Sequence, residues 1–193
     1  MGDWYKPMSF GREVGGTLRT LHLRLKDFRT DPSYRELSGD GRNGEWVMGF
    51  PIPPFQREHV WTRDQEIAFI DSARRGLPLG TYTYNVTAGK REAERVDADG
   101  RQYYYADLWL LDGMQRMTAL QNFFDGHFAV EGQYWQDIGE LERKFFLQDV
   151  HFAAYETQYT DEDTMRMIYD AMNYGGTAHT ESERALPARR PSP

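Results

Sequence analysis

The sequence predicts an α+β domain built on one compact mixed sheet flanked by helices. Segments with a helical spacing of apolar residues are interspersed with short runs rich in aromatic and β-branched residues, and both kinds are few. The chain has 193 residues, the size of one ordinary domain. We therefore expect a single domain over residues 1–183. A disordered tail over 184–193 should follow, because RALPARRPSP cannot form a packed core.

The first part of the chain predicts one helix, one loop and one short strand. Residues 17–28 place apolar side chains at i, i+3, i+7 and i+10, the spacing of one buried helical face. Residues 30–45 are rich in glycine, aspartate and asparagine without any period, so we expect a loop. Residues 46–50, WVMGF, predict a strand that the prolines after it end.

The middle of the chain predicts a capped helix and a hairpin. Thr62 as N-cap and Gln65 at the capping-box position predict a helix over 63–75. The aromatic runs 81–86 and 102–111 predict two strands of a hairpin, whose charged tip contains an Asp-Gly turn.

The last part of the chain predicts two helices and further β-structure. Helical spacing returns over 113–124, and residues 144–155, KFFLQDVHFAAY, predict a strand pair or one long bent strand. A final helix over 161–173 should begin after Thr160 as N-cap. Three acidic residues at its start favour the positive end of the helix dipole.

Composition excludes several classes of function. The chain has no cysteine, which excludes disulfides, thiol nucleophiles and cysteine-bound zinc. No apolar run is long enough for a membrane span or a signal peptide, so we expect a soluble, cytoplasmic protein without membrane partners. The net charge is −7, and residues 125–183 hold 13 acidic against 3 basic side chains. Strong binding to plain duplex DNA is therefore not expected.

The first motif that carries chemistry is a proline-stiffened loop at 52–61, IPPFQREHVW, that presents Gln56 and Arg57. A rigidly held guanidinium is a fixed fork of donors and suits an anion. The alternative is that Arg57 pairs with a nearby acid while the aromatic residues pack in the core.

The second motif is LLDGMQR at 110–116, where an apolar strand runs through Asp-Gly into a helix. The free backbone N–H groups of such a helix start, with Arg116 one turn inside, form a phosphate cradle. The alternative is that Asp112 only caps the helix and Gly113 only eases the turn. A third segment at 173–177, NYGGT, alone indicates a glycine stop after a helix.

Taken together, these strings resemble the N-terminal domain family of GmrSD-type modification-dependent restriction systems, over about residues 17–183. The resemblance implies a ParB/sulfiredoxin-like fold that binds a nucleotide. It also implies which residues line the phosphate site: Gln56, Arg57, Asp112, Gly113, Gln115 and Arg116. Asn173 and Thr177 match the family's late segment and are expected to close the pocket.

Several differences limit what the resemblance implies, and the first is His59, which stands where the family usually has tyrosine or phenylalanine. The sequence lacks the cysteine that sulfiredoxin uses, so reduction of sulfinic acids is excluded. Full-length family members carry a separate nuclease module, and we do not expect this chain to cleave DNA alone. It has no P-loop motif, so phosphoryl chemistry must use the Asp-Gly-x-x-Arg element.

The chemistry expected at this site is nucleoside triphosphate (NTP)-dependent phosphoryl transfer, either hydrolysis or kinase action on a hydroxyl such as that of a modified DNA base. Arg57 and Arg116 would neutralise phosphate charge. Asp112 would hold Mg²⁺ or orient the attacking hydroxyl, with Glu58 as second choice.

The alternative function is a non-catalytic, nucleotide-gated module that binds DNA or protein within a restriction or antirestriction system. Its partners would be modified DNA or a separate nuclease or modification enzyme. Any DNA contact is expected at the hairpin tip, which concentrates four basic residues: Lys90, Arg91, Arg95 and Arg101. Aromatic residues near that tip could stack on a base, although packing on a sheet face explains them as well.

Overall fold

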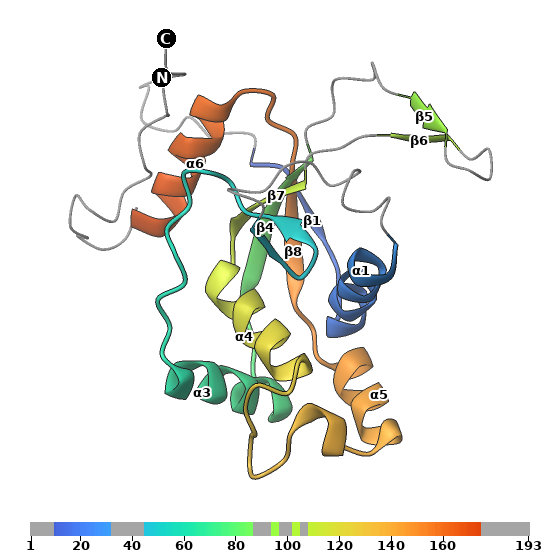
Figure 1. The fold of residues 1–193 in the computed structure, drawn as a ribbon. Coiled ribbons are helices and arrows are strands. Elements are labelled where there is room, and N and C mark those ends of the chain that lie inside the picture. The colour runs from blue at the N-terminus through green and yellow to red at the C-terminus, as the bar shows by residue number, and fades with distance from the viewer. Residues whose placement is uncertain (1–9, 32–44, 87–93, 97–101, 105–107, 175–193) are drawn as a thin grey trace.

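The fold is a four-stranded mixed sheet packed with helices, seen in a computed structural model (Figure 1). The structure describes residues 10–31, 45–86, 94–96, 102–104 and 108–174. The sheet has the strand order β1 (Arg12–Val14), β8 (Ala153–Thr157), β4 (Thr81–Val86), β7 (Leu108–Asp112). β4 pairs parallel with β8, and the other neighbours pair antiparallel. The α+β class with a mixed sheet is confirmed, and the ParB/sulfiredoxin-like fold stays a compatible prediction.

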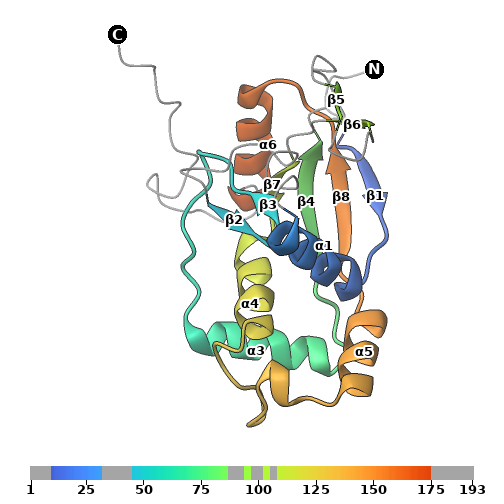
Figure 2. The ribbon, with the colours of Figure 1, turned by 45° about the vertical axis from the view of Figure 1, so that its right-hand side comes forward.

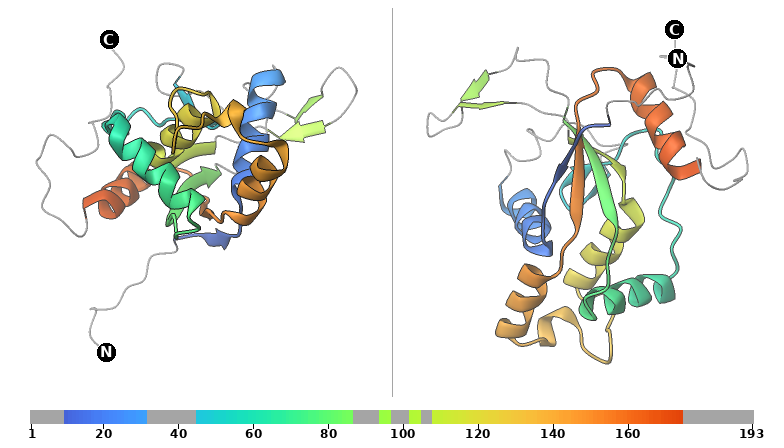
Figure 3. Two further views of the ribbon diagram at one scale, coloured as in Figure 1. Left: turned by 90° about the horizontal axis from the view of Figure 1, so that it is seen from below. Right: turned by 180° about the vertical axis from the view of Figure 1, so that it is seen from behind.

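The helices surround this sheet (Figures 2 and 3). They are α1 (Leu18–Thr30), α3 (Arg63–Arg74), α4 (Met114–Phe124), α5 (Glu140–Asp149) and α6 (Glu162–Tyr174). α6 packs beside β7, α3 packs against α4, and α1 packs against α5. Within the described ranges, no helix is long and apolar enough to cross a membrane.

Two clusters of buried side chains hold the elements together. The larger cluster joins α1 and α4 to the sheet through residues such as Leu21, Met117 and Phe152. The smaller cluster consists of Phe55, Leu111, Met165 and Tyr169 and ties the loop before α3 to β7 and α6. The smaller cluster therefore fixes the loop that carries Arg57 beside the start of α4.

The predicted strand at 46–50 is wrong in one respect, because the chain turns inside it. β2 (Trp46–Val47) and β3 (Phe50–Pro51) pair antiparallel around Met48 and Gly49. Both turn residues have positive φ, 50° and 77°, as a tight hairpin turn requires. Gly49 favours a turn, but the continuous apolar run over 46–50 led to the prediction of one strand. Pro51 also lies inside β3 and does not end the ladder before it.

The predicted hairpin between β4 and residues 102–111 is confirmed in part. Of the described part of the predicted second strand, only the residues from Leu108 onward pair with β4. β4 ends at Val86, and its last pair in the main sheet is with Leu108. β6 (Gln102–Tyr104) pairs with β5 (Glu94–Val96) in a separate two-stranded sheet. The predicted Asp-Gly turn between them lies outside the described residues.

The strand prediction over 144–155 is wrong for its first half, which forms α5. The run Phe145-Phe146-Leu147 fits a buried strand or a helix equally well by pattern alone. Glu140 and Glu142 in the first turn favour the helix dipole, and Phe146 and Leu147 face the core. Only the second half is a strand, β8.

The other predicted helices are confirmed, with one change of cap. At α6, the Oδ1 atom of Asp161 accepts a hydrogen bond from the Thr164 N–H at 2.7 Å, so Asp161 caps the helix in place of Thr160. The tail over 184–193 and most of the loop over 30–45 lie outside the described residues.

The capping box of α3 is present as predicted. The Thr62 N–H donates to Gln65 Oε1 at 2.8 Å, and the Gln65 N–H donates to Thr62 Oγ1 at 3.4 Å.

Thr62→Ala should lower the free energy of unfolding by about 1 kcal/mol, because the first turn of α3 loses its side-chain acceptor. Thr62→Ser keeps the hydroxyl and should stay close to the original protein. Urea denaturation of both variants measures the difference. Equal losses for alanine and serine would contradict a role for the hydroxyl.

Candidate functional site

The candidate site forms where β7 passes through Gly113 into α4. Gly113 has φ of 96°, and a Cβ there would lie 2.7 Å from the Cβ of Tyr82. The position therefore requires glycine for both conformation and space. A glycine N-cap supplies no side-chain acceptor, and α4 has no side-chain cap. Its first backbone N–H groups are thus available to an anion.

Gln115, in the first turn of α4, binds the loop before α3 by its side-chain amide. Its Oε1 atom accepts hydrogen bonds from the N–H groups of Val60 at 2.9 Å and Trp61 at 3.1 Å. Its Nε2 atom donates to the carbonyl of Glu58 at 3.0 Å. The amide is buried, so these three bonds fix residues 58–61 against the start of α4.

A buried carboxylate holds the same loop to α3 and α4. Oε1 of Glu66 accepts from Asn122 Nδ2 at 2.8 Å and lies 3.0 Å from His59 Nε2. Its other oxygen binds Arg63. Glu66 is a buried charged residue on α3, and its partners explain why its burial is tolerated.

Arg57 is the cation of this loop. Its backbone N–H donates to the hydroxyl of Tyr169 on α6 at 3.2 Å. Its guanidinium forms no hydrogen bond or ion pair with any residue that the structure describes. The alternative that Arg57 pairs with a local acid is thus not found among these residues.

Arg116, by contrast, is already engaged by the protein. Its guanidinium lies 2.8 Å from Asp112 Oδ2 and donates to the carbonyl of Leu79 at 3.1 Å. The pair joins the end of β7 to the first turn of α4. A phosphate near Arg116 would therefore meet a cation whose charge Asp112 partly offsets.

These residues surround one pocket of about 190 Å³. Its lining joins the loop before α3, the start of α4 and the end of α6: Gln56, Arg57, Trp61, Asp112, Gly113, Met114, Gln115, Arg116, Tyr169 and Asn173. Seven sequence-predicted residues thus come together. Asn173 also donates from Nδ2 to the carbonyl of Tyr169 at 2.9 Å.

The remaining predicted residues do not line this pocket in the described part of the chain. Glu58 is exposed and contributes its backbone carbonyl to Gln115. Thr177 and three of the four predicted DNA-binding residues, Lys90, Arg91 and Arg101, lie outside the described residues. Arg95 lies on β5, where side chains are not described.

Sequence reasoning missed Trp61, Met114 and Tyr169 as pocket residues. All three are apolar or aromatic side chains, for which packing in the core is the ordinary explanation. Tyr169 carried a weak signal, because a buried tyrosine needs a partner for its hydroxyl and here that partner is the Arg57 N–H.

Fold and pocket define an α+β domain with a candidate anion site at a helix start. A family model for the GmrSD restriction endonuclease, N-terminal domain, matches residues 35–148, more than half of the chain. The chain therefore belongs to this family, which connects it with restriction. No curated protein matches the chain. No solved structure does either.

Gln115→Ala should lower the free energy of unfolding by about 2–4 kcal/mol, because two N–H groups and a carbonyl lose a buried partner. Gln121→Ala, on the same helix, is the control, since Gln121 accepts only one backbone bond, from Met48 at 2.7 Å. It should cost about 1–2 kcal/mol.

Hydrogen exchange distinguishes this local effect from general destabilisation. In Gln115→Ala, the amides of Val60 and Trp61 should lose more protection than amides in β8. Uniform loss across the chain would contradict the assigned role of Gln115.

Proposed function

We propose that this chain binds a nucleotide by its phosphates at the start of α4, as the nucleotide-binding part of a restriction system. One observation carries the proposal: the guanidinium of Arg57, which no described residue binds, lines the same pocket as the N-terminus of α4, which no described side chain caps. A cation and a helix N-terminus attract the same ligand, an anion with several oxygen acceptors.

The size of the pocket supports phosphates as the part that enters. Sites for whole drug-sized ligands measure about 300–1,000 Å³. At about 190 Å³, this pocket is below that range. The nucleoside would then lie outside the pocket mouth, and binding would depend more on the number of phosphates than on the base.

The donor set fits a magnesium ion only together with a nucleotide. Among the described residues, no group of three acidic or histidine side chains could hold a metal. Asp112 is the one carboxylate in the pocket lining, and Arg116 already binds it. Mg²⁺ would therefore arrive with the phosphates and keep several of its water ligands, and Asp112 would add one carboxylate oxygen.

Phosphoryl transfer is the chemistry we propose for this site. Arg57 and the α4 amides would neutralise charge on the phosphate oxygens, and Asp112 would orient the acceptor hydroxyl. With water as acceptor the reaction is hydrolysis. With the hydroxyl of a modified DNA base or a small molecule it is kinase action.

The Asp112–Arg116 ion pair supports a second candidate function. The Asp112 carboxylate is already engaged by the Arg116 guanidinium at 2.8 Å, so it is not free to orient an acceptor hydroxyl unless this pair opens. The chain would then be a nucleotide-gated module that binds DNA, a nuclease or a modification enzyme without catalysing transfer itself.

Arg57→Gln should weaken nucleotide binding by about 1.5–3 kcal/mol, roughly 10- to 150-fold, because the charge-assisted hydrogen bonds to phosphate are lost. Arg75→Gln is the matched control, since Arg75 is exposed on α3 and pairs with Asp71. Titration calorimetry with nucleoside mono-, di- and triphosphates measures both variants. Equal affinities, or no nucleotide binding by the original protein, would contradict the proposed function.

Phosphate release separates the two candidates. NTP hydrolysis or transfer predicts turnover that Asp112→Asn abolishes. A gated module predicts tight binding without turnover, with or without DNA.

A further inference from the structure

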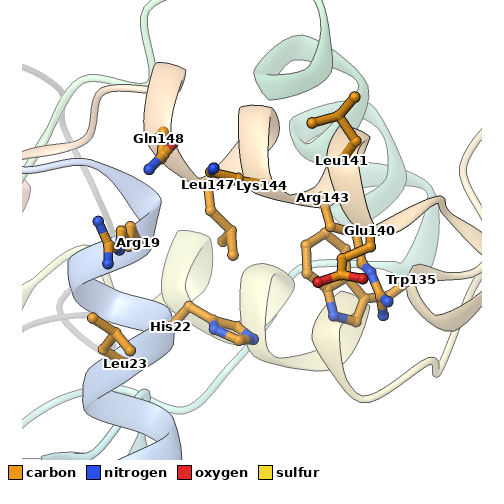
Figure 4. A pocket seen from close by; sticks show the side chains of 10 residues that line it. All are labelled: Arg19, His22, Leu23, Trp135, Glu140, Leu141, Arg143, Lys144, Leu147 and Gln148. Carbon is orange, nitrogen blue, oxygen red and sulfur yellow. The ribbon is translucent and has the colours of Figure 1, made fainter.

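A second and larger cavity lies between α1 and α5, away from the phosphate pocket. It measures about 810 Å³ and is open to solvent. Figure 4 shows the α1 side chains of Arg19, His22 and Leu23 opposite α5, with Trp135 at one end. We call this cavity the α1/α5 groove. It shares no lining residue with the phosphate pocket.

The groove has an apolar surface that no described element covers. α5 has no fully buried residue, and its Leu141 is 62% exposed. Across the groove, Leu23 of α1 is 44% exposed. Trp135 and Leu147 form the apolar floor. An exposed apolar groove with charged residues at its rim is typical of a protein-binding surface.

The rim of the groove is positively charged. Arg19, Arg143 and Lys144 line it, and Glu140 is the one acidic residue among the described lining residues. The pKa of His22 is lowered by burial and further by the charges of Arg29, Lys26 and Arg143.

We propose that the α1/α5 groove binds an acidic amphipathic helix of a partner protein. The leucines and the floor would take the apolar stripe of the helix, and Arg19 and Lys144 would face its acidic side chains. The exposed leucines favour a helix over nucleic acid, whose backbone offers no apolar stripe. The described residues that line the groove are different from those that line the phosphate pocket, so this site goes beyond the proposed nucleotide function.

The probe is a fluorescein-labelled peptide of about 18 residues, roughly 27 Å long as a helix, with leucine at i, i+3, i+4 and i+7 and glutamate elsewhere. Two comparison peptides replace glutamate by lysine or scramble the leucine positions. Fluorescence anisotropy measures binding to the full chain. Only the acidic, correctly spaced peptide should bind saturably.

Two pairs of variants locate the bound peptide. Arg19→Ala with Lys144→Ala should weaken binding on the order of fivefold, whereas Arg74→Ala with Arg75→Ala removes the same charge from α3 and should have no effect. Leu141→Ser should weaken binding about tenfold, whereas Leu77→Ser, at another exposed leucine, should not. All are surface substitutions, and nucleotide affinity should stay unchanged in each.

Three outcomes would overturn the proposal. The first is no saturable binding of the acidic peptide. The second is an equal loss of peptide affinity in the groove variants and in their control variants. The third is displacement of the peptide by a single-stranded oligonucleotide whose own binding needs Arg19 and Lys144, which would assign the groove to nucleic acid.

Discussion

The side-chain amide of Gln115 is the constraint on which the candidate site depends. It joins α4 to residues 58–61 by three hydrogen bonds, and so fixes a loop without secondary structure next to a helix start. Arg57 precedes this fixed segment directly, and its own N–H is tied to Tyr169. Three parts of the chain, far apart in sequence, thereby meet at one pocket.

The charges of the pocket are arranged unequally. Arg116 is balanced by Asp112, while Arg57 meets no acid among the described residues. A bound anion would thus be attracted mostly by Arg57 and the α4 amides. Arg116 would serve mainly to hold Asp112 and the backbone at Leu79, just before β4, in place. Gly113 completes the arrangement, because any side chain there would collide with Tyr82.

Local patterns predicted those parts of the fold that local interactions decide. The capping box at Thr62, the apolar face of α1 and the strand-to-helix passage at Gly113 follow from short-range hydrogen bonding and periodicity. α5 was missed because the run Phe145-Phe146-Leu147 fits a strand or a helix equally well, and only its packing in the fold selects the helix. Gln115 was predicted to touch nucleotide, but no local pattern could show that its amide binds a loop 54 to 57 residues away. The burial of Glu66 depends on tertiary contacts in the same way.

The central claim is that phosphates bind at the start of α4, and a titration of inorganic pyrophosphate followed by amide chemical shifts tests it most directly. The account predicts saturable shifts that are largest at the N–H groups of Gly113, Met114 and Gln115, and that disappear in Arg57→Gln. Shifts that do not saturate there, or that are largest in α1 and α5, would contradict it.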